Sequence, residues 1–180
     1  MAVAHTVRAA CAGQASACSS NRCARLATVA APSTSLRFEP LSAPGVLAVL
    51  GNLVDGDQEE IAAAGLADPA AAFLDVLEEC RGAVVTAGGV HLCAFGTRPF
   101  PGAVGVGIVW MVSTPALRDH LREVIRCAPG VVEQLQEPFH ELINCTHGKN
   151  AGALAFVRRI GFRVGTEPVG PGGAFFIISR

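Results

Sequence analysis

Residues 106–112 read Val-Gly-Ile-Val-Trp-Met-Val, which is an almost continuous apolar run. The run is too short to cross a membrane as a helix, which takes about 20 residues. A short apolar run of this kind is typical of a strand that is buried on both faces in the middle of a sheet. It therefore predicts a fold built around a central sheet.

Other strands are predicted on both sides of this run. Residues 83–87 and 90–95 flank the pair Gly88 and Gly89, which is the pattern of a β-hairpin with a glycine turn. The remaining predicted strands cover residues 36–41, 140–146, 162–164 and 174–178.

Helices are predicted where a capping residue precedes apolar residues at helical spacing. Asp68 followed by Pro69 starts one helix, because aspartate caps a helix N-terminus and proline suits the first helical position. The predicted helices cover residues 46–53, 69–80, 115–126 and 150–160, and no element is predicted over residues 54–68.

The helix predicted over residues 115–126 has signals both for its start and for a break. Ser113 or Thr114 is expected to cap it, with Pro115 at the first helical position. Pro129 and Gly130 are expected to kink or end it, with a continuation over residues 131–136.

The predicted order of elements is β-α-α-β-β-β-α-β-α-β-β. This order gives an α+β fold with a mostly antiparallel central sheet flanked by helices. We expect residues 36–180 to form it as a single domain, because a chain of 180 residues has room for one core.

Residues 1–35 differ in composition from this domain. They are rich in Ala, Ser and Cys, and no acidic residue occurs before Glu39. Organelle transit peptides share this composition, and a disordered or translated extension is the alternative reading. Cys11, Cys18 and Cys23 fall in this segment, and both readings stay open.

Charge and cysteine content exclude several kinds of site. A net charge of -1 gives no field that would gather nucleic acid, so no specific nucleic-acid partner is expected. The 7 cysteines contain no CxxC pair, which argues against a disulfide framework and against a metal site. Cysteines within the apolar segments are expected to be buried, and a soluble protein of a reducing compartment is indicated.

One stretch carries a family resemblance. The segment from Asn150 to Phe162 resembles the last sheet-crossing helix of the GNAT acyltransferases, with an Asn start, small residues, an aromatic residue and a Gly-Phe end. The residues that match these positions are Asn150, Ala153, Phe156, Ile160, Gly161 and Phe162. Together with the order of elements, the resemblance implies the GNAT fold.

Within that superfamily the chain resembles the internal virion protein A family of podophages. The likeness spans most of residues 36–180 and includes the pair Ala64 and Gly65, a strand that enters Trp110, and a short β tail at residues 176–179. The resemblance implies a non-catalytic bacteriophage protein that acts in virion assembly or DNA delivery. Its partners would be other phage or host proteins, and its location the host cytoplasm or the virion.

The segment that would bind acetyl-CoA lacks part of the usual chemistry. Acyl-CoA transferases hold the pyrophosphate on backbone amides at a helix N-terminus, and the family resemblance implies a glycine-rich turn there. Here residues 112–118 contain no glycine, and Pro115 has no N–H. If acetyl-CoA binds, the resemblance places its contacts at Val112, Thr114, Arg118 and Asn150. Asn150 is also expected to cap the N-terminus of its helix, and its contact with acetyl-CoA is the alternative reading.

The proton donor is also missing. The tyrosine that many GNAT enzymes use falls at Val157, and the chain contains no tyrosine. Glu141 and His91 are the candidate catalytic residues if the protein is active, although each is also an ordinary polar residue at a strand edge. Two functions therefore stay open: a non-catalytic phage protein with no cofactor, and an acetyl-CoA-dependent N-acyltransferase that acts on a small-molecule or protein amine.

Overall fold

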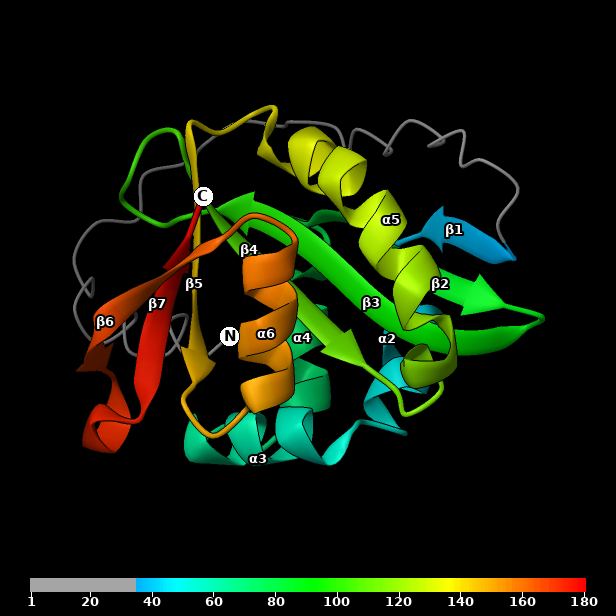
Figure 1. Cartoon of the computed structure of the whole chain (residues 1–180), viewed down its shortest axis with the longest axis horizontal. Coiled ribbons are helices and arrows are strands. Elements are labelled where there is room, and N and C mark those ends of the chain that lie inside the picture. Colours follow the sequence, from blue (N-terminus) through cyan, green and yellow to red (C-terminus); the bar gives the residue numbers. More distant parts are fainter. Residues whose placement is uncertain (1–34) are drawn as a thin grey trace.

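A seven-stranded sheet forms the centre of the computed structural model, which describes residues 35–180 (Figure 1). The expectations for residues 1–35 and their three cysteines lie, apart from Ser35, outside the described residues. The strands are β1 Leu36–Pro40, β2 Arg81–Ala87, β3 Val90–Pro99, β4 Val106–Ser113, β5 Glu141–His147, β6 Arg163–Val169 and β7 Phe175–Ser179. The helices are α2 Ala43–Leu50, α3 Asp55–Ala63, α4 Pro69–Leu77, α5 Leu117–Gln136, α6 Ala151–Arg159 and the 3-10 turn η1 Pro171–Gly173.

The sheet has the order β1-β2-β3-β4-β5-β7-β6, so β4 is its central strand, as the apolar run predicts. Neighbouring strands are antiparallel except β4 and β5. The α+β class and the mostly antiparallel sheet are therefore confirmed. The only parallel pair in the described sheet lies at its middle.

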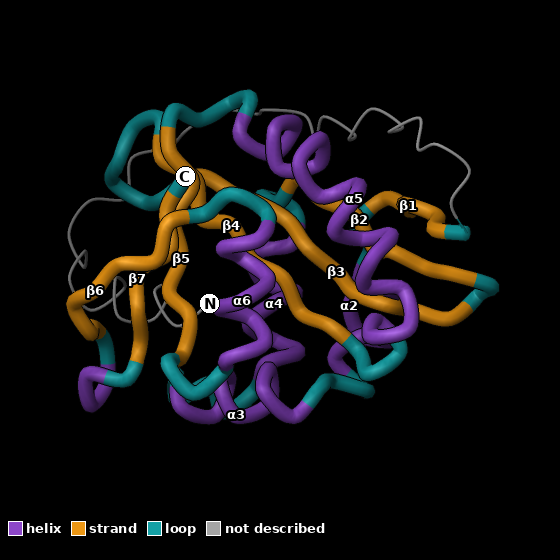
Figure 2. The backbone as a smooth tube through the Cα atoms, in the orientation of Figure 1, coloured by secondary structure: helices purple, strands orange, loops and turns teal. Residues whose placement is uncertain are grey.

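Helices cover both faces of the sheet (Figure 2). On one face Val124 and Val131 of α5 pack with Leu92 of β3, and residues of α6 join this cluster. On the other face Val46 of α2 and Phe73 of α4 pack against the central strands. Each face thus has a core of its own, with the sheet between them.

Helix α6 ends as the sequence predicts. Asn150 caps its start, since its side-chain Oδ1 accepts a hydrogen bond from the N–H of Ala153 at 3.1 Å. Gly161 follows its end with a φ of 97°. Phe162 is 5% exposed and lies in the core.

Helix α3 was not expected, and it is the main correction to the predicted order. Ile61 is its single buried residue, so the helix has almost no apolar stripe for periodicity to detect. Its first turn carries Asp55 and Asp57, and acidic residues at that end are stabilised by the helix dipole. Three helices therefore separate β1 from β2 instead of two.

The start of α5 also differs from the prediction. The helix begins at Leu117, because the Thr114 hydroxyl donates to the carbonyl of His91 at 2.8 Å instead of capping the helix. The Ser113 hydroxyl likewise does not cap α5, because it donates to Asp57. Pro129 does not break the helix; it lies on the exposed side, where water can bond to the carbonyl group that proline leaves free.

Within residues 35–180 no helix is both long and apolar enough to span a membrane. The four cysteines of this part, Cys80, Cys93, Cys127 and Cys145, are free thiols and buried, as their apolar surroundings predict.

Candidate functional site

The two central strands separate after a short paired section. β4 and β5 pair in register from Val106 with Glu141 to Ile108 with Ile143, and the described ladder continues no further. Residues 109–113 and 144–147 therefore flank a widening gap at the carboxyl ends of both strands. Backbone groups along this gap have no partner strand, which makes it a place where a ligand can bind.

The edge of β4 that faces the gap can be identified from Ser113. Its carbonyl accepts from the N–H of Val54, and its own N–H donates to Asp57 of α3. Alternate residues of a strand direct their backbone groups to the same edge. The N–H and C=O of Met111 and Val109 therefore face the gap as well.

Helix α3 crosses beneath the ends of both strands (Figure 1). Asp57 Oδ2 accepts from the N–H of Ser113 at 2.8 Å and from its hydroxyl at 2.9 Å, at the end of β4. Glu60, one turn further along α3, accepts through Oε2 from the N–H of His147 at 3.2 Å, at the end of β5. Two carboxylates thus occupy the positions that a neighbouring strand would otherwise fill.

Asn150 joins these carboxylates to the first turn of α6. Its side-chain Nδ2 donates to Glu60 Oε2 at 3.1 Å and, more weakly, to Asp57 Oδ1 at 3.4 Å. Gly56 allows this approach, because a Cβ atom there would lie 2.9 Å from Asn150 Oδ1. The cap of α6 is therefore also the link between α3 and α6.

Burial controls the protonation of this cluster. Loss of solvent raises the pKa of Asp57, although the hydrogen bonds from Ser113 and Asn150 oppose the rise. Burial likewise raises the pKa of Glu60, and the nearby Asp57 carboxylate adds to the effect. Burial also raises the pKa of Cys145, and that of Cys93 to about 12, so neither thiol is a ready nucleophile. Raised carboxyl pKa values in a cleft are typical of groups that exchange protons.

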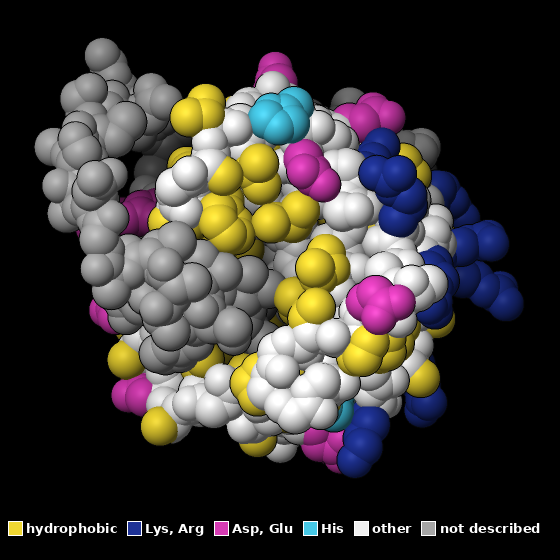
Figure 3. All heavy atoms as spheres, turned by 90° about the vertical axis from the view of Figure 1, so that its left-hand side faces the viewer, with side chains coloured by type: hydrophobic (Ala, Val, Ile, Leu, Met, Phe, Trp, Pro, Cys, Tyr) yellow, Lys and Arg dark blue, Asp and Glu magenta, His cyan; other side chains and the backbone are white. Residues whose placement is uncertain are grey.

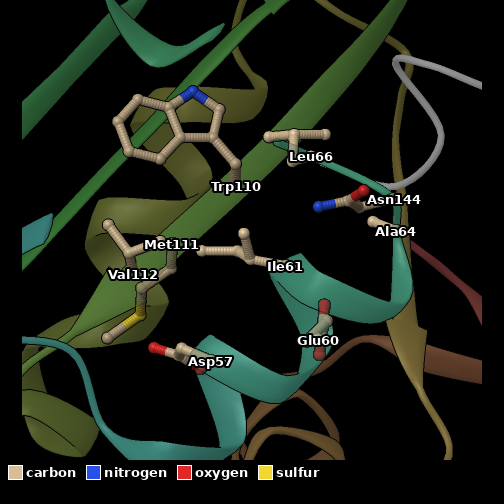
Figure 4. Close-up of a pocket in the computed structure, with 9 residues that line it drawn as sticks. All are labelled: Asp57, Glu60, Ile61, Ala64, Leu66, Trp110, Met111, Val112 and Asn144. Atoms are coloured by element: carbon tan, nitrogen blue, oxygen red, sulfur yellow. The ribbon is translucent and has the colours of Figure 1, made fainter. Parts of the chain in front are cut away.

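A pocket opens between α3 and the separated strands (Figure 4). Its cavity of about 40 Å³ has room for roughly three water molecules. Carboxylates, an amide and apolar side chains line it: Asp57, Glu60, Ile61, Ala64, Leu66, Trp110, Met111, Val112 and Asn144. Trp110 is held by its indole N–H, which donates to Cys80 Sγ at 3.4 Å.

The two predicted catalytic residues lie away from this pocket's lining. Glu141 is at the start of β5, in the section that is still paired with β4. His91 is on β3, beside a register shift in its pairing with β2. Their catalytic roles stay predictions, and the structure does not bring the two residues together.

The four residues predicted to contact the cofactor lie in different surroundings. Val112 lines the pocket, and Arg118 is exposed in the first turn of α5. Thr114 is 1% exposed; its hydroxyl bonds to His91 and its N–H to the carbonyl of Leu92. Asn150 contacts α3, and Val157, at the tyrosine position of the resemblance, packs against the core on the α5 side.

Solved structures of known proteins share this architecture. A GNAT-family acetyltransferase from Bacillus anthracis superposes with a TM-score of 0.58 at 13% identity, covering 81% of this chain and 93% of that one. An acetyltransferase from Agrobacterium tumefaciens superposes with a TM-score of 0.57 at 13% identity, covering 93% and 99%. The microcin C7 self-immunity acetyltransferase MccE, in complex with acetyl-CoA and AMP, gives 0.56 at 9% identity, covering 81% and 91%.

The chain has the GNAT fold. No family model and no curated protein matches its sequence. At identities of 9–13% the likeness establishes the GNAT fold alone, and none of these matches concerns a phage virion protein.

Sequence reasoning did not identify Asp57 and Glu60. They belong to the helix that was not predicted, and their partners lie far along the chain, 56 residues away for Ser113 and 87 for His147. The run of acidic residues at 55–60 directly before Ile61 is the one local signal, because it marks a helix N-terminus. Among residues 35–180 no group of His, Cys, Asp and Glu is arranged to hold a metal ion.

Proposed function

We propose that the protein is an N-acyltransferase that moves the acetyl group of acetyl-CoA to an amine. The observation that carries the proposal is the gap between β4 and β5, closed by two half-buried carboxylates of raised pKa, in a GNAT fold. The bound acetyl-CoA in the MccE structure supports the choice of acyl donor. The acetyl-CoA-dependent N-acyltransferase is thus favoured over the non-catalytic phage protein, the other function that the sequence left open.

The residues along the gap fit the thioester arm of acetyl-CoA. The N–H and C=O groups of Val109 and Met111 would bond its amides, as a neighbouring strand would. When bound, acetyl-CoA supplies the acyl group in activated form, as a thioester.

The diphosphate of acetyl-CoA would be bound mainly by charged side chains at the start of α5. At the start of α5 the N–H groups of Leu117 and Arg118 already donate to Thr114 and Pro115 carbonyls. The exposed guanidinium groups of Arg118 and Arg122, one turn apart, would hold the phosphates instead.

Glu60 is the proposed base. Its Oε2 accepts two hydrogen bonds, and its Oε1 accepts none from residues 35–180, so one oxygen is available to an incoming amine. Glu60 takes the proton that the amine nitrogen loses as its bond to the acyl carbon forms and the C–S bond breaks. Asp57, whose two oxygens are both bonded, positions α3 against β4.

The leaving thiolate must be protonated without the tyrosine typical of the family. Val157 cannot donate a proton, and we assign this step to water. A thiolate with a conjugate-acid pKa of about 8.5 is a sufficiently good leaving group for this. The predicted bases Glu141 and His91 are not needed in this scheme.

Two measurements test the proposal. Acetyl-CoA at a hundred times its dissociation constant should stabilise the folded chain by about 2.7 kcal/mol in a thermal-shift titration. Free thiol should appear when an amine is added with acetyl-CoA, and only then. Absence of both the stabilisation and the thiol would refute the proposal.

A non-catalytic protein of the phage particle is the second candidate. The valine at position 157 and the occupied amides at the start of α5 favour it, since both remove help that catalysis would use. In that case the protein would act through contacts with other phage or host proteins, in the host cytoplasm or the virion. Co-purification with assembled particles, without any thiol release, would support this candidate.

A further inference from the structure

Charge is divided unevenly between the two sides of the sheet. Residues 43–79, which form α2, α3 and α4, contain no lysine, arginine or histidine. The same residues hold eight of the 15 acidic residues: Asp55, Asp57, Glu59, Glu60, Asp68, Asp75, Glu78 and Glu79. Glu79 is paired with Arg98 of β3 at 3.6 Å, and Asp55, Glu59 and Asp75 are exposed.

The helices on the opposite face, α5 and α6, carry five of the 11 Lys and Arg residues of residues 35–180, together with three acidic residues of α5, Asp119, Glu123 and Glu133. Arg118, Arg122 and Arg126 follow each other at intervals of four residues on α5, and all three are exposed. Arg158 and Arg159 are exposed at the end of α6. In Figure 3 lysine and arginine side chains gather along the right-hand edge of the molecule.

The pocket belongs to the acidic side. Four of its lining residues come from α3 and the residue that follows it, one from the loop to α4, and none from α5 or α6. Trp110 and Val112 line it from β4 and belong to the core cluster that faces α2 and α4. Among the described residues, the charged groups that line this pocket are the carboxylates of Asp57 and Glu60, while the α5 side offers arginines to phosphates.

We propose that the acetyl acceptor is an amine that carries a second positive charge, such as a diamine or a lysine- or arginine-rich peptide. The proposal rests on the N-acyltransferase function above and adds the class of its acceptor. One amino group of the acceptor reaches Glu60 in the pocket as the neutral amine, and the ammonium group at its other end stays in the field of the exposed carboxylates. Clefts lined by one sign of charge concentrate ligands of the opposite sign and raise their association rates.

The same division of charge directs acetyl-CoA and the amine acceptor to different sides of the sheet. The phosphates of acetyl-CoA are attracted to the arginines of α5 and repelled from the α2–α4 side. An acceptor with a carboxylate of its own would be repelled there too. The acceptor that fits best is therefore opposite in charge to the acyl donor.

The experiment compares acceptors of one length and different charge, with the full chain and acetyl-CoA. The acceptors are cadaverine, which has two ammonium groups, aminopentanol, which has one, and aminopentanoate, whose second group is a carboxylate. We expect the KM of cadaverine to be about tenfold below that of aminopentanol, the lower end of the gain that a cleft lined by one sign of charge gives to ligands of the opposite sign. Aminopentanoate should have the highest KM, and added salt should narrow the differences.

Two double variants make the test specific to this surface. Glu59→Gln with Asp75→Asn removes two exposed charges from the α2–α4 side. Glu133→Gln with Glu167→Gln removes two exposed charges from α5 and β6. The first should raise the KM of cadaverine and leave that of aminopentanol unchanged, and the second should change neither.

The outcomes separate this inference from the function on which it rests. Equal KM values for the three acceptors would overturn the inference and leave the acyltransferase standing. If no acceptor is acetylated, cadaverine binding is measured by calorimetry without acetyl-CoA. Binding that the first double variant weakens would then sustain a site for cationic ligands on a protein that is not an acyltransferase, and no binding would overturn both proposals.

Discussion

Asn150 donates a hydrogen bond to Glu60 across 3.1 Å, and so connects the cap of α6 to the carboxylate at the end of β5. The same side chain accepts from Ala153, so the amide is oriented by the helix that it caps. A change at Asn150 will therefore alter the environment of Glu60 as well as the stability of α6.

Replacement of Asn150 by aspartate separates these two roles. Aspartate is an equally good N-cap, so we expect little change in the free energy of unfolding that comes from α6. It adds a negative charge beside Glu60 in place of a donor, which raises the pKa of Glu60 further. The acid limb of the kcat/KM profile should move to higher pH, with kcat/KM reduced roughly tenfold on that limb. An unmoved limb would show that Glu60 is not the group whose titration controls activity.

Replacement of Glu60 by glutamine should remove the base and keep the shape. We expect kcat to fall by about a hundredfold or more, the usual contribution of general base catalysis, and the acid limb of the pH profile to disappear. The matched control is Glu133→Gln, an exposed site on α5. Equal activity of the two variants would exclude Glu60 as the base and leave Glu141 and His91 as the candidate bases.

The raised pKa values of Asp57 and Glu60 predict how stability varies with pH. A carboxyl whose pKa is raised by folding binds its proton more tightly in the folded state. Stability from these groups is therefore full below their ordinary pKa values of 3.8 and 4.5, and it falls as pH rises toward the folded values. As the pH rises above about 4, the double variant Asp57→Asn with Glu60→Gln should lose less stability than the natural chain, by an amount set by the two pKa shifts. Urea unfolding at several pH values measures the difference, and parallel curves would contradict it.

Two glycine-to-alanine changes test the contact between α3 and Asn150. A Cβ at Gly56 would lie 2.9 Å from Asn150 Oδ1, whereas a Cβ at Gly130 in α5 would meet nothing within 4 Å. Gly130→Ala should stabilise the protein by about 0.5–1 kcal/mol through helix propensity alone. Gly56→Ala should destabilise it, so that the two variants differ by about 1 kcal/mol or more in chemical denaturation. A gain in both would show that Asn150 moves aside without loss.

The end of α6 gives a prediction that does not depend on function. Gly161 has a φ of 97°, a conformation that β-branched residues rarely adopt. Gly161→Val should lower the free energy of unfolding by at least about 1 kcal/mol, and Gly161→Asn should cost less, because asparagine tolerates positive φ. Equal stability of the two variants would remove the backbone explanation.

The parts of the fold that could be predicted from the sequence are those with a strong local signal. The run at residues 106–112 predicts the central strand, and Asn150 with Gly161 marks both ends of α6. Helix α3 could not be predicted in this way, because the sheet end that it covers contacts it through Asp57 and Glu60 and not through an apolar stripe. The start of α5 was mispredicted for a related reason. Ser113 and Thr114 are good caps locally, but their hydroxyls bond to Asp57 and His91 in the folded sheet.

The site shows the same limit. Polar residues such as Glu141 and His91 can be recognised in a sequence, but their distance from the gap is decided by strand register. Val112, which the resemblance gives as a cofactor contact, lines the pocket near the end of β4, and its role toward a cofactor stays a prediction. Glu60, the proposed base, could be identified only from the folded structure, which brings it to the end of β5.

The short parallel pairing of β4 with β5 also has a consequence for the order of folding. Strands β2, β3 and β4 follow one another in the chain and pair antiparallel across short connections, whereas α5 separates β4 from β5 and three helices separate β1 from β2. Pairings between nearby segments form faster than those that close long loops. We expect β2, β3 and β4 to assemble early, and β1 on one side and β5 with β7 and β6 on the other to be added later, the latter across three residue pairs.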